Sequence, residues 1–353
     1  MNISVKIKLL PDNAQKQSLL ATFEAFNAAA NHAAKVGFDD KTFSVPSIQK
    51  KCYYDIRKRY NLTAQLAIRS IGKAAECFRC DKKVCPKFNP RSAVVYDQRI
   101  MSFKGLTHVS LASVDGRLKI PMVIAGYQDT KLQEAVKTGQ ADLVYVNKTF
   151  FLIVSITVDD VKPQQATRVL GVDLGVNNIA VDSEGNVYTG DDVEAKRKQF
   201  QKRRSALQSV GTRSAKRRLK MNSKKESDYR RTLNHQISRR IVDTAKALGA
   251  SIQLENLKGI RKGIEKRFRK SQRAKISGWS FHQLRSFIEY KAELAGVVVD
   301  LINPRNTSRT CPSCGHCDRA NRKTQERFEC VECDFCEQAD FVAAINIAAA
   351  PAL

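Results

Sequence analysis

The spacing of hydrophobic positions divides the first half of the chain into three stretches. Residues 3–9 alternate apolar and polar side chains, which is typical of a half-buried strand. Apolar residues then recur at helical spacing from 11 to about 83. From 93 to 158 the sequence is rich in β-branched residues, with turn pairs at Asp115-Gly116 and Asn147-Lys148. We therefore expect an all-β module that a helical insert interrupts.

The second half shows a different pattern, in which strands and helices take turns. Residues 163–167 suit a linker. The elements expected after it are strands at 169–174, 179–181 and 187–189, helical residues from 193 to 248, a strand at 251–255, a helix at about 280–294 and a strand at 297–302. Strands that alternate with helices predict an α/β domain.

Charge narrows the class of partner. The chain has 61 Lys and Arg against 35 Asp and Glu, a formal net charge of +26. Such an excess indicates a polyanion, either nucleic acid or an anionic membrane surface. The sequence has no apolar run long enough to span a membrane and no signal-peptide pattern at its start. We therefore favour nucleic acid, expect no membrane partner, and expect a cytoplasmic, nucleoid-associated location.

Two basic stretches are the natural candidates for phosphate contacts. They span residues 196–240 and 259–275. A run of charge is often only a solvated helix face. Here the excess has one sign and recurs, so contact with a phosphate backbone is the favoured interpretation.

Three segments far apart in the chain each place one carboxylate on or beside an apolar element. Asp173 follows the run Val-Leu-Gly-Val, Glu255 ends an alternating strand, and Asp340 begins a stretch with apolar residues at helical spacing. A buried acid is costly unless a partner or a metal compensates it. Each acid alone also has an ordinary interpretation, as a turn residue, a surface acid and a helix cap respectively.

Taken together, the three acids fit a site for two Mg²⁺ ions that cuts phosphodiesters. Carboxylates from neighbouring elements can hold two such ions about 3.5–4 Å apart. One ion would lower the pKa of an attacking water, and the other would stabilise the leaving 3′ oxygen. Hard cations prefer oxygen ligands, which Asp and Glu supply. We predict Asp173, Glu255 and Asp340 as catalytic residues and magnesium ligands.

Four cysteines near the C-terminus form the most specific local motif. Cys311 and Cys314 make one C-x₂-C pair, Cys330 and Cys333 make a second, and fifteen residues separate the pairs. This is the spacing of a structural zinc site, in which four thiolates complete a tetrahedron and leave no position for water. We predict one structural Zn²⁺, with an iron–sulfur cluster as the minor alternative.

The other clustered cysteines carry weaker signals. Cys317 and Cys336 extend the two pairs, but four thiolates already complete the tetrahedron, so we interpret these two as spare. Cys77, Cys80 and Cys85 lie close together in the helical insert without an obvious fourth ligand. Packing roles are therefore favoured there over a metal.

Several motifs together resemble the TnpB family of transposon-encoded, RNA-guided nucleases, which are related to the type V CRISPR effectors. The matching segments are Gly-Val-Asp-Leu-Gly-Val-Asn-Asn-Ile-Ala at 171–180, Leu-Glu-Asn-Leu-Lys at 254–258, Tyr-Lys-Ala at 290–292, Thr-Ser-Arg-Thr-Cys-Pro-Ser-Cys-Gly at 307–315 and Asp-Phe-Val-Ala-Ala-Ile-Asn-Ile at 340–347. Residues 96–103 also resemble the family's β-rich wedge region. The similarity covers most of the chain.

The resemblance implies a multidomain fold that combines α/β and all-β parts. Its expected parts are a wedge β-barrel domain at 1–10 and 84–162, a helical recognition insert at 11–83, a RuvC-like nuclease domain of RNase H-like fold at 167–310 and 335–353, and a zinc-ribbon module at 311–334. The predicted acids would form the RuvC active site.

The resemblance also implies a function. The chain would be an RNA-guided DNA endonuclease, in which a guide RNA from the transposon end pairs with one strand of double-stranded target DNA. The protein would read a short adjacent motif in the DNA duplex. A monomer is favoured. The alternatives are an RNA-guided DNA-binding regulator with weak or no cleavage, and a compact type V CRISPR effector.

Two positions depart from the family pattern. Val342 stands where the family usually has Asn, and Ala339 often has a polar or basic counterpart. Neither replaces a predicted metal ligand, so the departures concern the rate of cleavage and the shape of the pocket rather than the fold.

Overall fold

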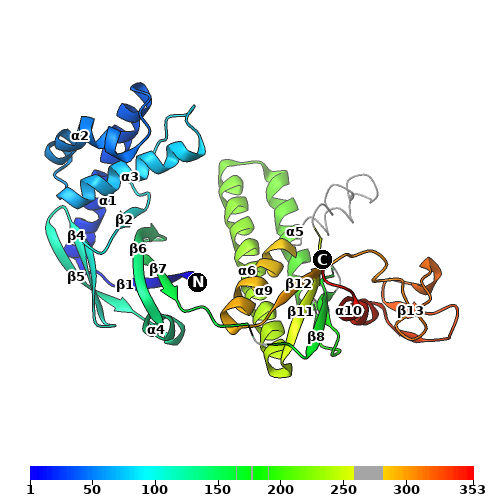
Figure 1. Cartoon of the computed structure of the whole chain (residues 1–353). Coiled ribbons are helices and arrows are strands. Elements are labelled where there is room, and N and C mark those ends of the chain that lie inside the picture. The colour runs from blue at the N-terminus through cyan, green and yellow to red at the C-terminus, as the bar shows by residue number, and fades with distance from the viewer. Residues whose placement is uncertain (164, 176–177, 190, 258–280) are drawn as a thin grey trace. The chain divides into compact units, whose positions relative to one another are not determined.

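The computed structural model describes residues 1–163, 165–175, 178–189, 191–257 and 281–353 (Figure 1). The chain divides into two units, of which the first ends at Asp159 and the second begins at Asp160. The basic stretch predicted at 259–275 lies outside these residues. None of the described helices is long and apolar enough to cross a membrane.

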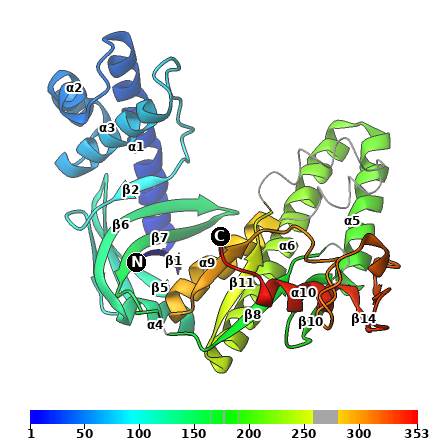
Figure 2. The same cartoon turned by 45° about the vertical axis from the view of Figure 1, so that its right-hand side comes forward.

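The N-terminal unit, Met1–Asp159, joins a sheet to a group of helices. Its elements are β1 (Asn2–Leu9), α1 (Asn13–Asp39), α2 (Val45–Tyr60), α3 (Ala64–Cys80), β2 (Val94–Tyr96), β3 (Met101–Lys104), β4 (His108–Ser113), β5 (Gly116–Val123), α4 (Gly126–Gln133), β6 (Ala135–Val146) and β7 (Thr149–Val158). The helices α1 to α3 therefore interrupt the strands after β1, as the spacing predicted, and Figure 2 shows them grouped at one end of the sheet.

All seven strands of this unit form one antiparallel sheet in the order β2-β6-β7-β1-β5-β4-β3. The sheet is nearly closed: the hydroxyl of Tyr96 on edge strand β2 donates to the carbonyl of Ala112 on β4, 2.8 Å away. The β6–β7 hairpin turns at Asn147 and Lys148, which both have positive φ, as its two-residue turn requires.

One expectation for this unit was wrong. The stretch from 93 to 158 was expected to contain only strands, but it includes helix α4. This segment, Gly-Tyr-Gln-Asp-Thr-Lys-Leu-Gln, lacks the alternation of a strand and buries none of its residues. Its first turn is held locally, because the side chain of Gln128 accepts a hydrogen bond from the N–H of Ala125 at 3.2 Å. A short surface helix therefore connects β5 to β6.

The C-terminal unit, Asp160–Leu353, is built on a mixed sheet. Its elements are β8 (Arg168–Asp173), β9 (Asn178–Asp182), β10 (Val187–Thr189), α5 (Asp191–Val210), α6 (Arg213–Leu248), β11 (Ala250–Glu255), α9 (Phe281–Ala295), β12 (Val299–Ile302), the 3₁₀ helix η1 (Arg319–Asn321), β13 (Arg327–Glu329), β14 (Cys336–Gln338) and α10 (Ala339–Ala349). Five strands pair in the order β10-β9-β8-β11-β12, and β13 pairs with β14. In the larger sheet β8, β11 and β12 are parallel, and β9 runs antiparallel to its neighbours.

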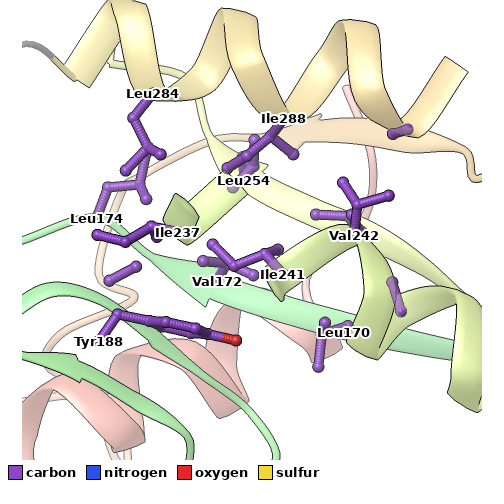
Figure 3. Packing of buried hydrophobic residues seen from close by; sticks show 14 of the residues in the cluster. Leu170, Val172, Leu174, Tyr188, Ile237, Ile241, Val242, Leu254, Leu284 and Ile288 are labelled. Atoms are coloured by element: carbon purple, nitrogen blue, oxygen red, sulfur yellow. The ribbon is translucent and has the colours of Figure 1, made fainter. Parts of the chain in front are cut away.

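Helices cover both faces of this sheet. Ile237 and Ile241 of α6 and Leu284 and Ile288 of α9 pack on Leu254 and its neighbours in the sheet (Figure 3). The helical stretch predicted from 193 to 248 is in fact two helices, because Gly211, at a φ of +65°, separates α5 from α6.

Gly171 explains how α10 reaches the opposite face. A Cβ atom at Gly171 would lie 2.1 Å from the carbonyl oxygen of Ala344 and 2.5 Å from the amide nitrogen of Ala348, both in the backbone of α10. Only glycine therefore lets this helix lie directly on β8. The contact fixes the position of α10, whose first turn contains Asp340.

Candidate functional site

The three predicted acids come from three elements of the C-terminal unit that meet. Asp173 is the last residue of β8 and Glu255 the last of β11. These strands are parallel and pair Val172 with Leu254, so the two acids follow at the same end of neighbouring strands. Asp340 lies in the first turn of α10, which packs on β8. The fold thus brings together side chains that are far apart in sequence.

The environment of Asp173 disfavours its charged form. Burial raises the pKa of Asp173 to about 8, and the negative charges of Glu255 and Asp340 act in the same direction. The guanidinium of Arg322 and the backbone N–H of Leu174 oppose this shift only in part. A carboxyl group held in this way gains from any cation that enters the site.

Glu255 is oriented by a neighbour from a loop. The hydroxyl of Thr307 donates to Oε1 of Glu255 at 2.6 Å. Burial raises the pKa of Glu255, whereas this hydrogen bond and the charge of Arg322 lower it. Thr307 is itself held by α10, because the side-chain amide of Asn346 donates to its carbonyl oxygen at 2.7 Å.

Asp340 is held by two partners at once. It is buried, with 9% of its surface exposed. The side-chain amide of Asn178 on β9 donates to its Oδ2 at 2.9 Å, and the guanidinium of Arg322 donates to its Oδ1 at 3.2 Å. The carboxylate is therefore fixed from the sheet on one side and from the cysteine-containing segment on the other.

The residues of this acidic site fit hard divalent cations. Its three predicted ligands offer only carboxylate oxygens, the donors that Mg²⁺ prefers. Their mutual repulsion, expressed in the raised pKa of Asp173, is the kind that a bound cation relieves. The three carboxylates do not all lie within 4.8 Å of one another, since among the described residues only the cysteine cluster meets that spacing.

Sequence reasoning missed three residues of the site: Asn178, Thr307 and Arg322. The first two stand inside segments that carried the family resemblance, so their motifs were a usable signal. No sequence pattern marked Arg322, because its ion pair with Asp340 depends on how the segment after the first cysteine pair folds.

The fold of that segment places Arg322 through its neighbour, Asn321. Asn321 is fully buried, and its amide donates to the carbonyl oxygens of Arg309 at 2.9 Å and His316 at 3.1 Å. Its side-chain oxygen accepts the N–H of Val331 at 3.0 Å. Asn321 thus ties the loops around the two cysteine pairs together and fixes the direction in which the chain presents Arg322.

The four predicted zinc ligands, Cys311, Cys314, Cys330 and Cys333, form one cluster. Their sulfur atoms all lie within 4.8 Å of one another. The sulfurs of Cys311 and Cys333 are 3.7 Å apart, and those of Cys314 and Cys330 are 3.6 Å apart. Four sulfurs at about 2.3 Å from a zinc ion stand about 3.8 Å from one another, so the cluster has the dimensions of a tetrahedral site. Cys317 and Cys336 are exposed and outside the cluster.

A small core connects the cysteine cluster to the start of α10. Val342 and Ala339 are buried, with 0% and 1% exposed, and pack with Phe328 and Cys311. Both positions that depart from the family pattern therefore face this core. An apolar side chain suits each of them for that reason.

The cysteines of the helical insert form no comparable group. Among the described residues, Cys77, Cys80 and Cys85 do not meet the spacing that a shared metal requires. Cys77 and Cys85 are half-buried, which is compatible with the packing role expected for them, whereas Cys80 is exposed and does not fill that role.

The comparisons with known proteins agree on one family. A model described as a probable transposase (OrfB_IS605) matches residues 152–261, and one described as a Cas12f1-like TNB domain matches 281–347. A TnpB-like protein of Methanocaldococcus jannaschii is 29% identical over 207 residues, which cover 55% of this chain and 73% of that protein. The chain is similar in sequence to TnpB-like and Cas12f proteins.

Two further matches show the extent of the similarity. The CRISPR-associated endodeoxyribonuclease Cas12f1 of Syntrophomonas palmitatica is 32% identical over 161 residues, which cover 41% of this chain and 31% of that protein. The match thus spans less than a third of this relative's length. A Cas12f1 solved by cryo-electron microscopy with single-guide RNA and target DNA superimposes with a TM-score of 0.60 at 17% identity, over 94% of this chain and 81% of that one. This likeness concerns the fold.

Proposed function

We propose that the chain is an RNA-guided DNA endonuclease that hydrolyses phosphodiesters of target DNA with a RuvC-type site. The observation that carries the proposal is the meeting of Asp173, Glu255 and Asp340 from β8, β11 and α10, with the pKa of Asp173 raised to about 8. Relatives named as endodeoxyribonucleases support the same class of reaction.

The sheet supports an RNase H-like nuclease domain. Its strands follow the order third, second, first, fourth, fifth along the chain of this unit, and only the second runs against the others. Ligands of open α/β sheets bind beyond the carboxyl ends of the parallel strands, which is where Asp173 and Glu255 lie.

Asp173, Glu255 and Asp340 would hold two Mg²⁺ ions, which would activate a water molecule and stabilise the leaving oxygen. The chain's own residues prepare this site. Thr307 orients the carboxylate of Glu255, and Asn178 orients that of Asp340. Arg322 supplies positive charge beside Asp340, where a phosphate group of the substrate would approach.

The cysteine cluster would bind one structural Zn²⁺ and thereby hold Arg322 in place. Two of the four ligands, Cys311 and Cys330, lie in the core that α10 shares with this module. Binding of zinc would close the loop that contains Asn321 and Arg322. The zinc would therefore act on cleavage through the position of Arg322 and of α10.

The proposed partners are a guide RNA from the transposon end and double-stranded target DNA, bound by a monomer of the protein. The net charge of +26 supports a large nucleic-acid surface. In α6, basic side chains such as Arg217, Arg218 and Lys224 are exposed along one long helix. The nearly closed sheet and the helices α1 to α3 would form the wedge and recognition parts that contact the guide and the duplex motif.

The test is to express the protein together with its flanking genomic DNA and to sequence the RNA that co-purifies. The complex is then incubated with DNA that matches this RNA, with and without Mg²⁺. The proposal predicts a discrete RNA and Mg²⁺-dependent cutting of the matching DNA only. If the protein carries a discrete RNA and binds the matching DNA but does not cut it, the nuclease is rejected in favour of the RNA-guided DNA-binding regulator.

A further inference from the structure

We propose that the helical insert of the N-terminal unit contains a pocket for one unpaired nucleotide of a single-stranded nucleic acid, stacked on Phe43. This inference rests on the proposed function, because it adds a binding site to a nucleic-acid enzyme. It concerns residues far in sequence from the acidic site. The pocket belongs entirely to the N-terminal unit.

The pocket lies between the first turn of α2 and the last turn of α3. It has a volume of about 450 Å³, within the range of small-ligand pockets of roughly 300–1,000 Å³. Eight residues line it, and its apolar wall includes Val45, Pro46 and Ala75. The space is large enough for a nucleobase with part of its sugar.

Two phenylalanines give the pocket an aromatic wall. The rings of Phe43 and Phe78 have centroids 4.9 Å apart and are inclined by 54°. Phe78 is 1% exposed and fixed in the core of the insert, whereas Phe43 is only half-buried. Phe43 therefore retains an accessible face, and an unpaired base can stack on such a face whatever its sequence.

The charged side chains that line the pocket are both cations. They are Arg79 and Lys82, and the ammonium group of Lys82 lies 5.7 Å from the ring centroid of Phe43. None of the lining residues is acidic. Asp81, between the two cations in sequence, accepts a hydrogen bond from the backbone N–H of Lys83 at 2.8 Å and does not line the pocket. An apolar wall with cations beside it matches a base with its phosphate.

The same charges argue against the other occupants. An apolar peptide would gain nothing from Arg79 and Lys82 and would leave them beside a dry surface. A second copy of the chain would bring identical cations and a net charge of +26 to the contact. A nucleotide uses both features, because its base can stack on the aromatic face and its phosphate can pair with the cations.

The test uses the full-length chain, freed of nucleic acid at high salt. Single-stranded oligonucleotides of one mixed sequence, as RNA with 5-iodouridine and as DNA with 5-iododeoxyuridine, are cross-linked to it by light and mapped by mass spectrometry. We expect an adduct at Phe43, and the arm that gives it distinguishes RNA from DNA. Phe43→Leu keeps an apolar side chain but removes the stacking face, so it should abolish the adduct and weaken binding at least about fivefold.

Two variants serve as controls. Phe43→Trp keeps an aromatic face and should retain the adduct and the affinity. Tyr127→Leu removes an exposed aromatic ring on α4, outside the pocket, and should leave both unchanged. Circular dichroism spectra that match the wild type would show that Phe43→Leu folds normally.

Three results would overturn the inference, and they differ in what else they reject. Binding by the wild type with no adduct at Phe43 and no loss in Phe43→Leu rejects the pocket alone. A wild-type dimer that Phe43→Leu converts to a monomer, with oligonucleotide binding unchanged, assigns the pocket to self-association. Failure of the wild type to bind either oligonucleotide rejects the proposed function as well.

Discussion

The guanidinium of Arg322 lies 3.2 Å from the carboxylate of Asp340, so a residue of the cysteine-containing segment forms part of the acidic site. The same cation lowers the pKa of Asp173 and of Glu255, against the effect of their burial. Arg322 therefore acts on all three acids. A metal ion bound by the three acids would neutralise the same carboxylates as Arg322 does. Metal binding should therefore be coupled to the Arg322–Asp340 ion pair.

Replacement of Arg322 tests this coupling. Arg322→Gln leaves the buried Asp340 without its cation and should lower the free energy of unfolding in Mg²⁺-free buffer by about 1–3 kcal/mol. Added Mg²⁺ should then raise the melting temperature of Arg322→Gln by more than it raises that of the wild type. Thermal unfolding with and without Mg²⁺ measures both effects.

Arg327 offers a matched control in the same segment. It forms an ion pair with Glu329, also at 3.2 Å, but both side chains are exposed. Arg327→Gln should change stability by less than about 1 kcal/mol and leave the effect of Mg²⁺ unchanged. Equal responses to Mg²⁺ in Arg322→Gln and the wild type would contradict the coupling.

The raised pKa of Asp173 predicts a pH dependence of stability. The folded protein holds the proton of Asp173 up to about pH 8, whereas the unfolded chain releases it near pH 4. Without Mg²⁺, the contribution of Asp173 to stability should therefore fall as the pH rises from about 4 to about 8. Asp173→Asn removes this loss and should be more stable than the wild type at pH 8, on the order of a few kcal/mol.

Denaturant titrations of both proteins at pH 5 and pH 8, in Mg²⁺-free buffer, measure this difference. A stability difference between the two proteins that grows from pH 5 to pH 8 identifies the titration of Asp173, since a general effect of the substitution would be similar at both pH values. A wild type that is more stable than Asp173→Asn at pH 8 would contradict the assigned environment.

The cysteine cluster predicts which substitutions remove zinc. Cys311→Ser with Cys314→Ser should lower the zinc content from about one ion per chain to none and lower the melting temperature. Cys317→Ser with Cys336→Ser should retain the zinc, because those sulfurs lie outside the cluster. Elemental analysis of the purified proteins measures the zinc. Loss of zinc from the protein that carries both Cys317→Ser and Cys336→Ser would show that the ligand set is different.

Close packing at Gly171 predicts a large effect from one methyl group. Gly171→Ala would place a Cβ 2.1 Å from the carbonyl oxygen of Ala344, so α10 must move away from β8 and take Asp340 with it. We expect a loss of about 1–3 kcal/mol in stability and a strong reduction of cleavage. Gly72→Ala is the control: a methyl group there meets nothing within 4 Å, and in the helix α3 it should stabilise by about 0.5–1 kcal/mol. Similar losses in the two variants would contradict the packing argument.

The sequence was most informative where local pattern and chemistry coincide. Alternation predicted the strands β1 and β11, and the turn pair Asn147-Lys148 predicted the β6–β7 hairpin, because each of these is determined within a few residues. The spacing of the four cysteines predicted a cluster whose sulfurs the fold does bring together.

What the sequence could not supply depends on distant parts of the chain. Neither the ion pair of Arg322 nor the hydrogen bond of Thr307 to Glu255 follows from spacing, since each joins elements that only the folded sheet and helix bring together. The burial of Val342 against Phe328 is of the same kind. Helix α4 was missed for another reason, because a short surface helix that buries no residue has no periodic pattern.

The most direct test of the central claim is to compare DNA cutting by the guided complex before and after substitution of one acid. Complexes of the wild type, Asp173→Asn and the exposed control Glu293→Gln are incubated with matching DNA and Mg²⁺. We predict that Asp173→Asn retains the RNA and binds the target but does not cut, while Glu293→Gln cuts like the wild type. Cutting by Asp173→Asn at the wild-type rate would contradict the assignment of the acidic site.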